Sequence, residues 1–425
     1  MTGERPGREE NVGRLTEPFR FAYDAPAVRC GQDVAADLDA ELDNHGFKRA
    51  LVVCGQTVGS TPAVMDPVRE GLGDRLAGVF AETTPAKRLS TAADGLAALD
   101  EHDADVVVAV GGGSSLDTGK VIGVLAARIA AAIDDGTSVD REAVLAEVGC
   151  EFAETGTIAV PEEGVVPVVA VPTTLAGADI SQGAGLTASP AGGLVTEAVG
   201  GGVSDPPLMP ASVVVDSALL ATTPEGVLAA SAMNGFDKGI ETLYASTATP
   251  ITDATAIRGL SLFQDGLLAF GDGDRDARVF DALARGIVLV QYGISRPDET
   301  TLSLVHAFGH GLTRTGDLQQ GAAHAIVAPH ALEFLFEQVD GRRDLLAEAL
   351  GVGGADDPAA AVVEAVTEVR DALGLPRRLR DVDGPDREAF AEVVDIVLED
   401  AFMANVPEGL DVTADDIEGI LDAAW

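Results

Sequence analysis

Four of the six histidines in this chain fall within 25 residues, and their spacing suits metal or proton chemistry. His306 and His310 are four residues apart in an apolar segment with helical periodicity, so both imidazoles should project from one helix face. His324 and His330 follow closely. Imidazoles presented in this way bind metal ions or relay protons. One buried histidine is usually a packing residue, but a cluster in a histidine-poor chain indicates a functional site.

Lys238 is one of only four lysines among 425 residues, and it stands in an apolar helical segment that also contains Asn234. The ordinary alternative is a surface lysine whose stem lies along apolar neighbours. A chain that has nearly lost lysine is expected to keep one here for a purpose, because a buried ammonium has a perturbed and chemically useful pKa. The candidate catalytic residues are therefore Lys238, His306, His310, His324 and Asn234.

A glycine-rich turn follows an apolar run at 105–110 and opens an alanine-rich helical segment. Glycine lets the backbone approach a ligand closely, and the free N–H groups of a helix start bind an anion such as a pyrophosphate. This motif alone leaves open a tight turn with an ordinary salt bridge, and the chain has no GxGxxG fingerprint. The candidate cofactor-binding residues in this motif are Gly111, Gly112, Gly113, Ser114, Asp117 and Lys120.

A second polar motif, Pro172 to Ser181, follows another strand-like run at 165–171. Hydroxyl groups at the carboxyl end of a strand lie where open α/β sheets bind ligands, although a Pro-Thr turn with local hydrogen bonds is the simpler alternative. Thr173, Thr174 and Ser181 are the candidates here. Gly55, just after the run at 50–54, is a further candidate. An acidic residue at such a turn would repel the 2′-phosphate of NADP, and a glycine there removes that charge.

These motifs require elements that hold them, and the pattern of apolar runs predicts two domains. Short apolar strands at 50–54, 105–110, 165–171 and 213–216 alternate with helical segments, which predicts an α/β domain with a parallel, doubly wound sheet. Amphipathic helices dominate afterwards. We expect a flexible arm at 1–19, a dinucleotide-binding α/β domain at 20–217 and an all-α domain at 218–425. Residues 188–210, rich in glycine and proline, should form an exposed loop.

The composition narrows the class of protein further. The net charge of −41 argues against nucleic-acid binding, which needs clustered Lys and Arg. The sequence contains no apolar stretch of membrane-spanning length and begins without a secretory apolar region, so we expect a cytoplasmic protein. An acid excess spread along the chain is typical of halophilic proteins, in which salt screens the self-repulsion. We expect a small-molecule substrate as the partner, and a homodimer as a further option.

Taken together, the motifs resemble the iron-containing alcohol dehydrogenase superfamily along nearly all of the chain. The resemblance implies a nicotinamide cofactor in a cleft between an α/β domain and a helical domain. Among the members, the chain is most similar to maleylacetate reductases, which share the Ser-x-Met-Asn start and a histidine at the position of His324. The matching motifs run in order as Gly111 to Lys120, Pro172-Thr-Thr, Asp216, Asn234 to Glu241, His306 to His310, Pro329-His330 and Asn405-Val-Pro407.

The same resemblance places the family's four metal ligands at Asn234, Lys238, His306 and Gln320 of this chain. Only His306 is a good ligand, because amide oxygens bind weakly and an ammonium repels a cation. We therefore expect no metal at this site and assign carbonyl polarisation to Lys238, with His306 and His310 as donors or a proton relay.

The resemblance, together with these residues, implies an NAD(P)-dependent oxidoreductase that transfers hydride between nicotinamide and a small, anionic carbonyl or alcohol substrate. We expect NAD or NADP as the cofactor, with NADPH used at least as well as NADH. Two alternatives stay open: a metal-dependent alcohol or polyol dehydrogenase with a shifted site at His306, His310 and His324, or a non-redox relative similar to dehydroquinate synthase.

Overall fold

The computed structural model describes residues 18–133, 140–297 and 299–425. These residues form two compact units, one built on a sheet and one of helices. The sheet unit comprises Asp24–Leu228 and Asp276–Ala284, and the helical unit comprises the remainder. We expected the boundary between the two domains after residue 217. In the structure the main segment of the sheet unit ends eleven residues later, at Leu228, in the first turn of helix α9 (Glu225–Tyr244). The expected arm at 1–19 lies almost wholly outside the described residues.

The sheet unit holds six parallel strands in the order β1-β8-β5-β4-β2-β3. The four central strands are almost entirely buried, as parallel strands covered on both faces must be, whereas the edge strands β1 and β3 are partly exposed. This confirms the parallel α/β fold predicted from the apolar runs. The strands are β1 (Ala27–Gly31), β2 (Ala50–Gly55), β3 (Leu76–Thr83), β4 (Val106–Gly111), β5 (Val168–Pro172) and β8 (Ser212–Asp216).

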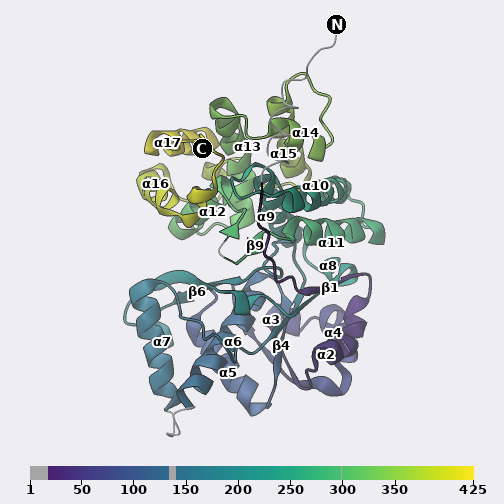
Figure 1. Cartoon of the computed structure of the whole chain (residues 1–425), viewed down its shortest axis with the longest axis vertical. Helices are drawn as coiled ribbons and strands as arrows, with labels where there is room; N and C mark the ends of the chain where they lie inside the picture. Colours follow the sequence, from purple (N-terminus) through teal and green to yellow (C-terminus); the bar gives the residue numbers. More distant parts are fainter. Residues whose placement is uncertain (1–17, 134–139, 298) are drawn as a thin grey trace. The chain divides into compact units, whose positions relative to one another are not determined.

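Alternate side chains of β4 face opposite layers of helices. Val106, Val108 and Val110 join the apolar cluster that includes side chains of α2 (Leu38–His45) and α4 (Pro62–Leu72). On the other face, Val107 and Ala109 meet α6 (Gly113–Ile133) at Gly119, whose ideal Cβ would lie 3.1 Å from both side chains. Figure 1 shows the two groups of helices on either side of the sheet. The other helices of this unit are α3 (Gln56–Gly59), α5 (Leu89–Glu101), α7 (Arg141–Thr155) and α8 (Ser217–Leu220).

The glycine-rich segment 188–210 is not simply an exposed loop. It contributes β7 (Val199–Ser204), which pairs antiparallel with β6 (Gly183–Ala188) through six residue pairs. The prediction of a loop was wrong because glycines lowered the apparent strand propensity. One of them, Gly201, packs against the carbonyl oxygen of Gly156, at a place where a Cβ atom would lie only 2.0 Å from that oxygen.

The helical unit brings α9 (Glu225–Tyr244), α12 (Leu304–Thr315) and α13 (Gln320–Gln338) together. Gly321 packs so closely on α9 that a Cβ would lie 1.7 Å from the Ala230 carbonyl oxygen. The mostly helical C-terminal region predicted from amphipathic periodicity is therefore confirmed. Its other helices are α10 (Pro250–Gly271), α11 (Ala277–Gln291, whose first turns belong to the sheet unit), α14 (Arg343–Ala349), α15 (Pro358–Ala372), α16 (Phe390–Glu399) and α17 (Ala414–Ala424).

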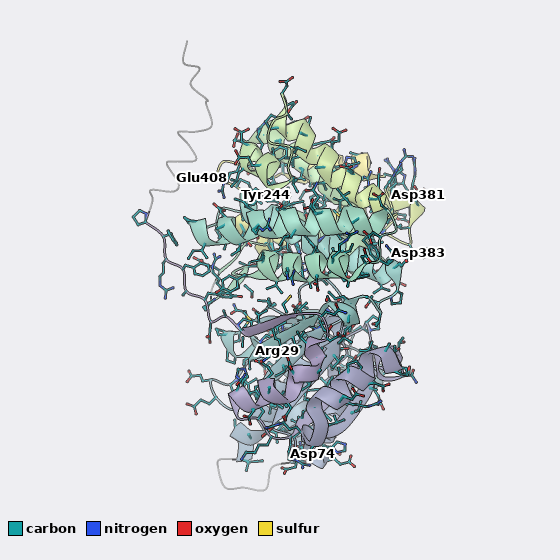
Figure 2. The ribbon with its side chains drawn as sticks, turned by 90° about the vertical axis from the view of Figure 1, so that its right-hand side faces the viewer. Arg29, Asp74, Tyr244, Asp381, Asp383 and Glu408 are labelled. Atoms are coloured by element: carbon teal, nitrogen blue, oxygen red, sulfur yellow. The ribbon has the colours of Figure 1, made fainter. Side chains whose placement is uncertain are left out.

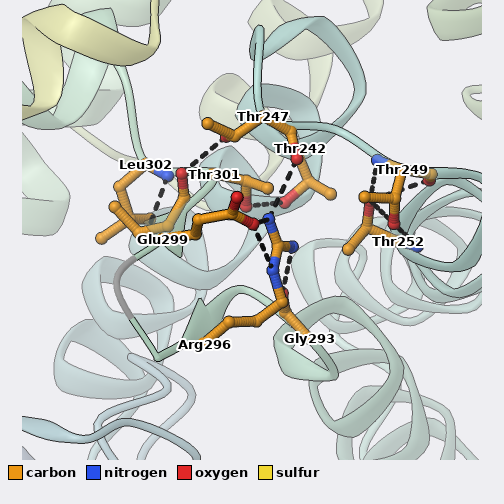
Figure 3. A network of polar contacts seen from close by, with 10 residues as sticks. Thr242, Thr247, Thr249, Thr252, Gly293, Arg296, Glu299, Thr301 and Leu302 are labelled. Carbon is orange, nitrogen blue, oxygen red and sulfur yellow. Dashed lines mark hydrogen bonds and ion pairs between the residues drawn. The ribbon is translucent and has the colours of Figure 1, made fainter. Parts of the chain in front are cut away.

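A buried arginine fixes the entry to α12. Arg296, in the short hairpin of β9 (Ser295–Arg296) and β10 (Glu299–Thr300), is 1% exposed and donates to the carbonyl oxygens of Gly293 and Thr247 and to Glu299 (Figure 3). Beside it, the hydroxyls of Thr301 and Thr242 lie 2.8 Å apart and join this segment to α9. These bonds fix the position of the start of α12 relative to α9.

Within the described ranges, no helix has both the length and the apolar character needed to cross a bilayer.

Candidate functional site

The predicted cofactor residues of the sheet unit meet at the carboxyl ends of neighbouring strands. Gly111 at the end of β4 pairs with Pro172 at the end of β5, and the Thr173 amide donates to the Gly111 carbonyl oxygen at 3.0 Å. Gly55 ends β2, the next strand on the other side of β4. The sheet topology therefore gathers three segments that are more than fifty residues apart in sequence.

The glycine turn itself is shaped by close contacts that only glycine allows. Gly111 has a φ of 138°, and a Cβ there would lie 2.7 Å from Oγ of Ser115. A Cβ on Gly112 would lie 3.1 Å from the Thr174 methyl group. Gly112, Gly113 and Ser114 keep partial exposure where α6 begins, so backbone N–H groups of the first helical turn are available to an anion. These residues fit a nucleotide pyrophosphate.

Asp117 and Lys120 are buried and hold protein groups. Asp117 accepts from Lys87 at 2.6 Å and from the Gly185 amide at 3.0 Å. The Lys120 ammonium, 1% exposed, donates to the carbonyl oxygens of Ala178, Ser181 and Gly183 at 2.6–3.0 Å. An ammonium has three N–H donors, so Lys120 is suited to holding the 178–183 segment beside α6 and not to contacting a ligand.

Ser181 has a local structural bond as well. Its Oγ accepts from the Gly183 amide at 3.0 Å, within the segment that Lys120 holds.

The sequence did not single out Lys87, which adopts a left-handed backbone with a φ of 50° beside Asp117. The rarity of lysine in this chain was the one signal that could have drawn attention to it.

In the helical unit, His306 and His324 lie together with an acidic residue that the sequence analysis missed. The ring centroids are 4.4 Å apart, and Oδ2 of Asp237 lies 3.3 Å from Nδ1 of His306 and 3.2 Å from Nδ1 of His324. Asp237 and His324 are 0% exposed and His306 is 2% exposed. Among the described residues, these three are the one group whose side-chain geometry could hold a metal ion.

Glu241 completes the buried cluster from the next turn of α9. Its Oε1 accepts the His306 backbone amide at 3.0 Å, and its Oε2 lies 2.5 Å from Nδ1 of His306. Tyr244, labelled in Figure 2, is 1% exposed and donates to the same carboxylate. On the other side of the imidazole, Nε2 of His306 lies 3.2 Å from Oδ1 of Asn234. The two ring nitrogens of His306 thus face different groups.

Burial sets the protonation of this cluster. It raises the pKa of Asp237, with help from Glu241, and it also raises the pKa of Glu241. Burial lowers the pKa of His306 and of His324, and the nearby charge of Lys238 lowers both further. Apart from the contacts of Oδ2 of Asp237 with the two imidazoles, the oxygens of Asp237 and the ring nitrogens of His324 have no hydrogen-bond partner within the described residues. Each such buried atom costs about 1–3 kcal/mol when nothing compensates it.

A glycine creates the space for His324. Gly309 lies between His306 and His310 on α12, and a Cβ at this position would lie 2.3 Å from Nε2 of His324. Gln320 is also close to this position, since its Cγ would lie 3.3 Å from a Cβ on Gly309. The close approach of α12 and α13 therefore depends on the absence of a side chain at Gly309.

His310 does not join the buried cluster. Its Nδ1 bonds Oδ2 of Asp400 at 2.7 Å, and its ring lies 5.2 Å from that of Phe402. Of the three histidines in the alternative shifted site, His306 and His324 therefore lie together, and His310 does not join them. Asp237 is the third group beside His306 and His324. His330 lies six residues after His324 on α13, and its Nδ1 is 3.5 Å from Oε2 of Glu333.

The family's metal positions do not suit a metal in this chain. Lys238, half-buried in α9, brings a positive charge to one of these positions, and Gln320 and Asn234 offer only neutral amides. The ring nitrogen of His306 that faces these positions already contacts Asn234. No catalytic step through such a metal follows from these residues.

Comparisons with known proteins agree with this architecture. A model of the iron-containing alcohol dehydrogenase family matches residues 25–217, and one of the C-terminal region of the same family matches residues 228–425. An NAD-dependent methanol dehydrogenase from Bacillus methanolicus is 28% identical over 83% of this chain and 86% of its own length. A maleylacetate reductase from Pseudomonas aeruginosa is 27% identical, covering 90% of this chain and 92% of its own.

Solved structures show the same fold at low identity. A maleylacetate reductase from Agrobacterium tumefaciens has a TM-score of 0.73 at 21% identity and covers 96% of this chain and 99% of its own. A sulfoacetaldehyde reductase from Bifidobacterium kashiwanohense in complex with NAD+ has a TM-score of 0.76 at 19% identity, with the same coverage of both chains. The protein is therefore an oxidoreductase that belongs to the iron-containing alcohol dehydrogenase family.

Proposed function

We propose that this chain transfers hydride between NAD(P) and the carbonyl or alcohol carbon of a small substrate that carries a carboxylate. The observation that carries the proposal is the pairing of Gly111 with Pro172, which sets a glycine turn and two threonines at adjoining strand ends. Relatives that are NAD-dependent or bind NAD+ support the cofactor. When bound, the nicotinamide supplies or accepts the hydride.

In this proposal, the residues of the sheet unit bind the cofactor in two ways. The N–H groups of Gly112, Gly113 and Ser114 face the pyrophosphate, and the partly exposed Thr174 offers a polar group beside it, whereas the buried Thr173 holds the Gly111 carbonyl oxygen through its amide. Asp117 and Lys120 act as positioning residues, because their charged groups hold Gly185 and the 178–183 segment.

Lys238 is the group that we propose to polarise the substrate oxygen. It is half-buried, it occupies a family metal position, and its charge reaches both His306 and His324. An ammonium stabilises a developing alkoxide and also attracts a carboxylate. His310, partly exposed and held by Asp400, is suited to deliver or accept the proton. Asn234, His306 and His324 position these groups from the buried side.

The experiment is an assay of NADH and NADPH oxidation by the purified protein with matched pairs of aldehydes and ketones. Each pair differs by one carboxylate, so that charge is the variable. We expect kcat/KM to be at least about tenfold higher for the anionic member, because a cation in the site favours it. Equal rates for both members would refute the anionic substrate class, and no oxidation of either cofactor with any carbonyl would refute the hydride-transfer proposal.

We also propose that the protein is halophilic, because its net charge of −41 is spread along the chain, and we keep the expectation that it is cytoplasmic. Activity and melting temperature should both rise with KCl concentration, since salt screens repulsion among the acidic groups. Maximal activity at low salt would refute the halophilic character.

A further inference from the structure

We propose that Asp237, His306 and His324 bind a divalent first-row transition ion of the Zn2+ or Fe2+ kind, at a site distinct from the family's metal position. The two sites share only His306, and they use opposite nitrogens of its ring. Nε2 faces Asn234 on the family side, whereas Nδ1 faces Asp237. The proposal keeps our expectation that the family position holds no metal, and it does not depend on the identity of the cofactor or substrate.

The spacing of the ligand atoms fits such an ion. Tetrahedral Zn2+ binds nitrogen and oxygen at about 2.0–2.1 Å, which sets neighbouring ligand atoms about 3.3–3.4 Å apart. The two measured separations from Oδ2 of Asp237 are 3.3 Å to His306 and 3.2 Å to His324. Two imidazoles and one carboxylate are a donor set that suits zinc and iron(II).

The surroundings of these atoms support the same conclusion. Apart from the contacts of 3.2–3.3 Å between Oδ2 of Asp237 and the two imidazoles, the oxygens of Asp237 and the nitrogens of His324 form no hydrogen bond within the described part of the chain, although both residues are 0% exposed. A buried carboxylate needs a compensating charge, and within this cluster the neighbouring, half-buried Lys238 is the one lysine whose charge acts on Asp237. One divalent ion would balance the carboxylates of Asp237 and Glu241 while both imidazoles stay neutral, as metal binding requires.

Glu241 would act as a positioning residue for this site. It accepts the backbone amide of His306 and lies 2.5 Å from the Nδ1 atom that the ion would use. When Nδ1 turns to the ion, the carboxylate keeps its bonds to the His306 amide and to Tyr244 and supplies the second negative charge. Because all of the ligands are buried, the ion would tie α9, α12 and α13 together and would not meet the substrate.

The test begins with elemental analysis of the full-length protein, followed by chelation and titration with Co2+. Cobalt in a site of low coordination gives visible absorption bands, which report binding without any enzymatic assay. We expect stoichiometric binding by the parent chain. Asp237→Asn and His324→Gln should each weaken Co2+ binding at least about a hundredfold, and Glu241→Gln about tenfold or more.

Matched controls separate this site from its neighbours. His310→Gln removes an imidazole from the same helix, and Asn234→Ala and Gln320→Ala alter the family positions; all three should keep the bands. Added Zn2+ should raise the melting temperature of the parent and of these controls, but not of Asp237→Asn or His324→Gln. Circular dichroism establishes that each variant is folded. If one ligand variant fails to fold, the other decides.

Two results would overturn the proposal. One is the absence of stoichiometric Co2+ binding by the folded parent chain. The other is binding that survives in Asp237→Asn and His324→Gln but disappears in Asn234→Ala or Gln320→Ala, which would place the ion at the family position. Either result leaves the cofactor assay unaffected, so failure here is distinguishable from failure of the proposed hydride transfer.

Discussion

Nδ1 of His310 lies 2.7 Å from Oδ2 of Asp400, a residue 90 positions further along the chain. His306, one turn earlier on the same helix, faces Asp237 and Glu241 instead. His306 and His310 are spaced as two ligands of one site would be, but their side chains contact different acidic residues. Asp400 thus engages Nδ1 of a partly exposed His310, while the His306 cluster is closed to solvent.

The Asp400 contact should make stability depend on pH. Partial burial acts to raise the pKa of Asp400, but the bond from His310 and its charge outweigh this and lower the pKa below the usual 3.8. A lowered carboxyl pKa contributes stability that is present above the unfolded value and lost as pH falls through the folded value. Asp400→Asn should therefore cost about 1–3 kcal/mol at neutral pH and progressively less in acid.

The measurement is denaturant unfolding of Asp400→Asn and the parent from neutral pH down to strongly acidic pH. Asp395→Asn, which alters an exposed carboxylate on the neighbouring helix α16, is the control and should change little at any pH. A constant difference between Asp400→Asn and the parent across the range would show that the ionised carboxylate is not the stabilising form.

Lys238→Met should lower kcat by about a hundredfold while leaving the KM for the cofactor nearly unchanged, because the ammonium would act on the developing charge of the transition state. Methionine keeps the length and apolar stem of lysine. Steady-state kinetics with both substrates varied gives the two parameters separately. Lys238→Arg should retain more activity than Lys238→Met. A Lys238→Met enzyme with a normal kcat would make Lys238 a structural residue.

Gly309→Ala should destabilise the helical unit by about 1–3 kcal/mol, because the new methyl group would overlap the His324 ring. The control is Gly419→Ala on α17, where a Cβ meets nothing within 4 Å. That change should be neutral or stabilise the protein by up to about 1 kcal/mol through helix propensity. Thermal and urea unfolding of both variants provide the comparison, and equal effects would contradict the close packing of α12 on His324.

Gly55 should permit use of NADPH at least as well as NADH. The turn after β2 carries no acidic side chain to repel a 2′-phosphate, and Gln56 and Thr57 offer neutral polar groups. Gly55→Asp should lower kcat/KM for NADPH about tenfold relative to NADH through charge repulsion. A Cβ here lies 3.3 Å from the Thr83 carbonyl oxygen, so Gly55→Asn is needed to separate bulk from charge. Strong NADH selectivity in the parent would contradict the prediction.

The central strands of the sheet could be predicted from the sequence because they are apolar at nearly every position. The runs that became β2, β4, β5 and β8 are buried on both faces and bounded by turn residues. The edge strands β1 and β3 and the glycine-rich β7 gave no such signal. Their residues are partly exposed or small, and their pairing partners decide their structure.

The residue types that could do chemistry, and the helical segments that carry them, could be recognised from the amino-acid sequence alone. His306, His324 and Lys238 stand out there because histidine and lysine are rare in this chain. The contacts of Asp237 with both histidines and the bond between His310 and Asp400 depend on packing between helices, which no local pattern in the sequence reveals. Helix periodicity fixes which side chains share a face of one helix, but contacts among α9, α12 and α13 depend on packing at Gly309 and Gly321, where the lack of a side chain lets helices distant in sequence approach.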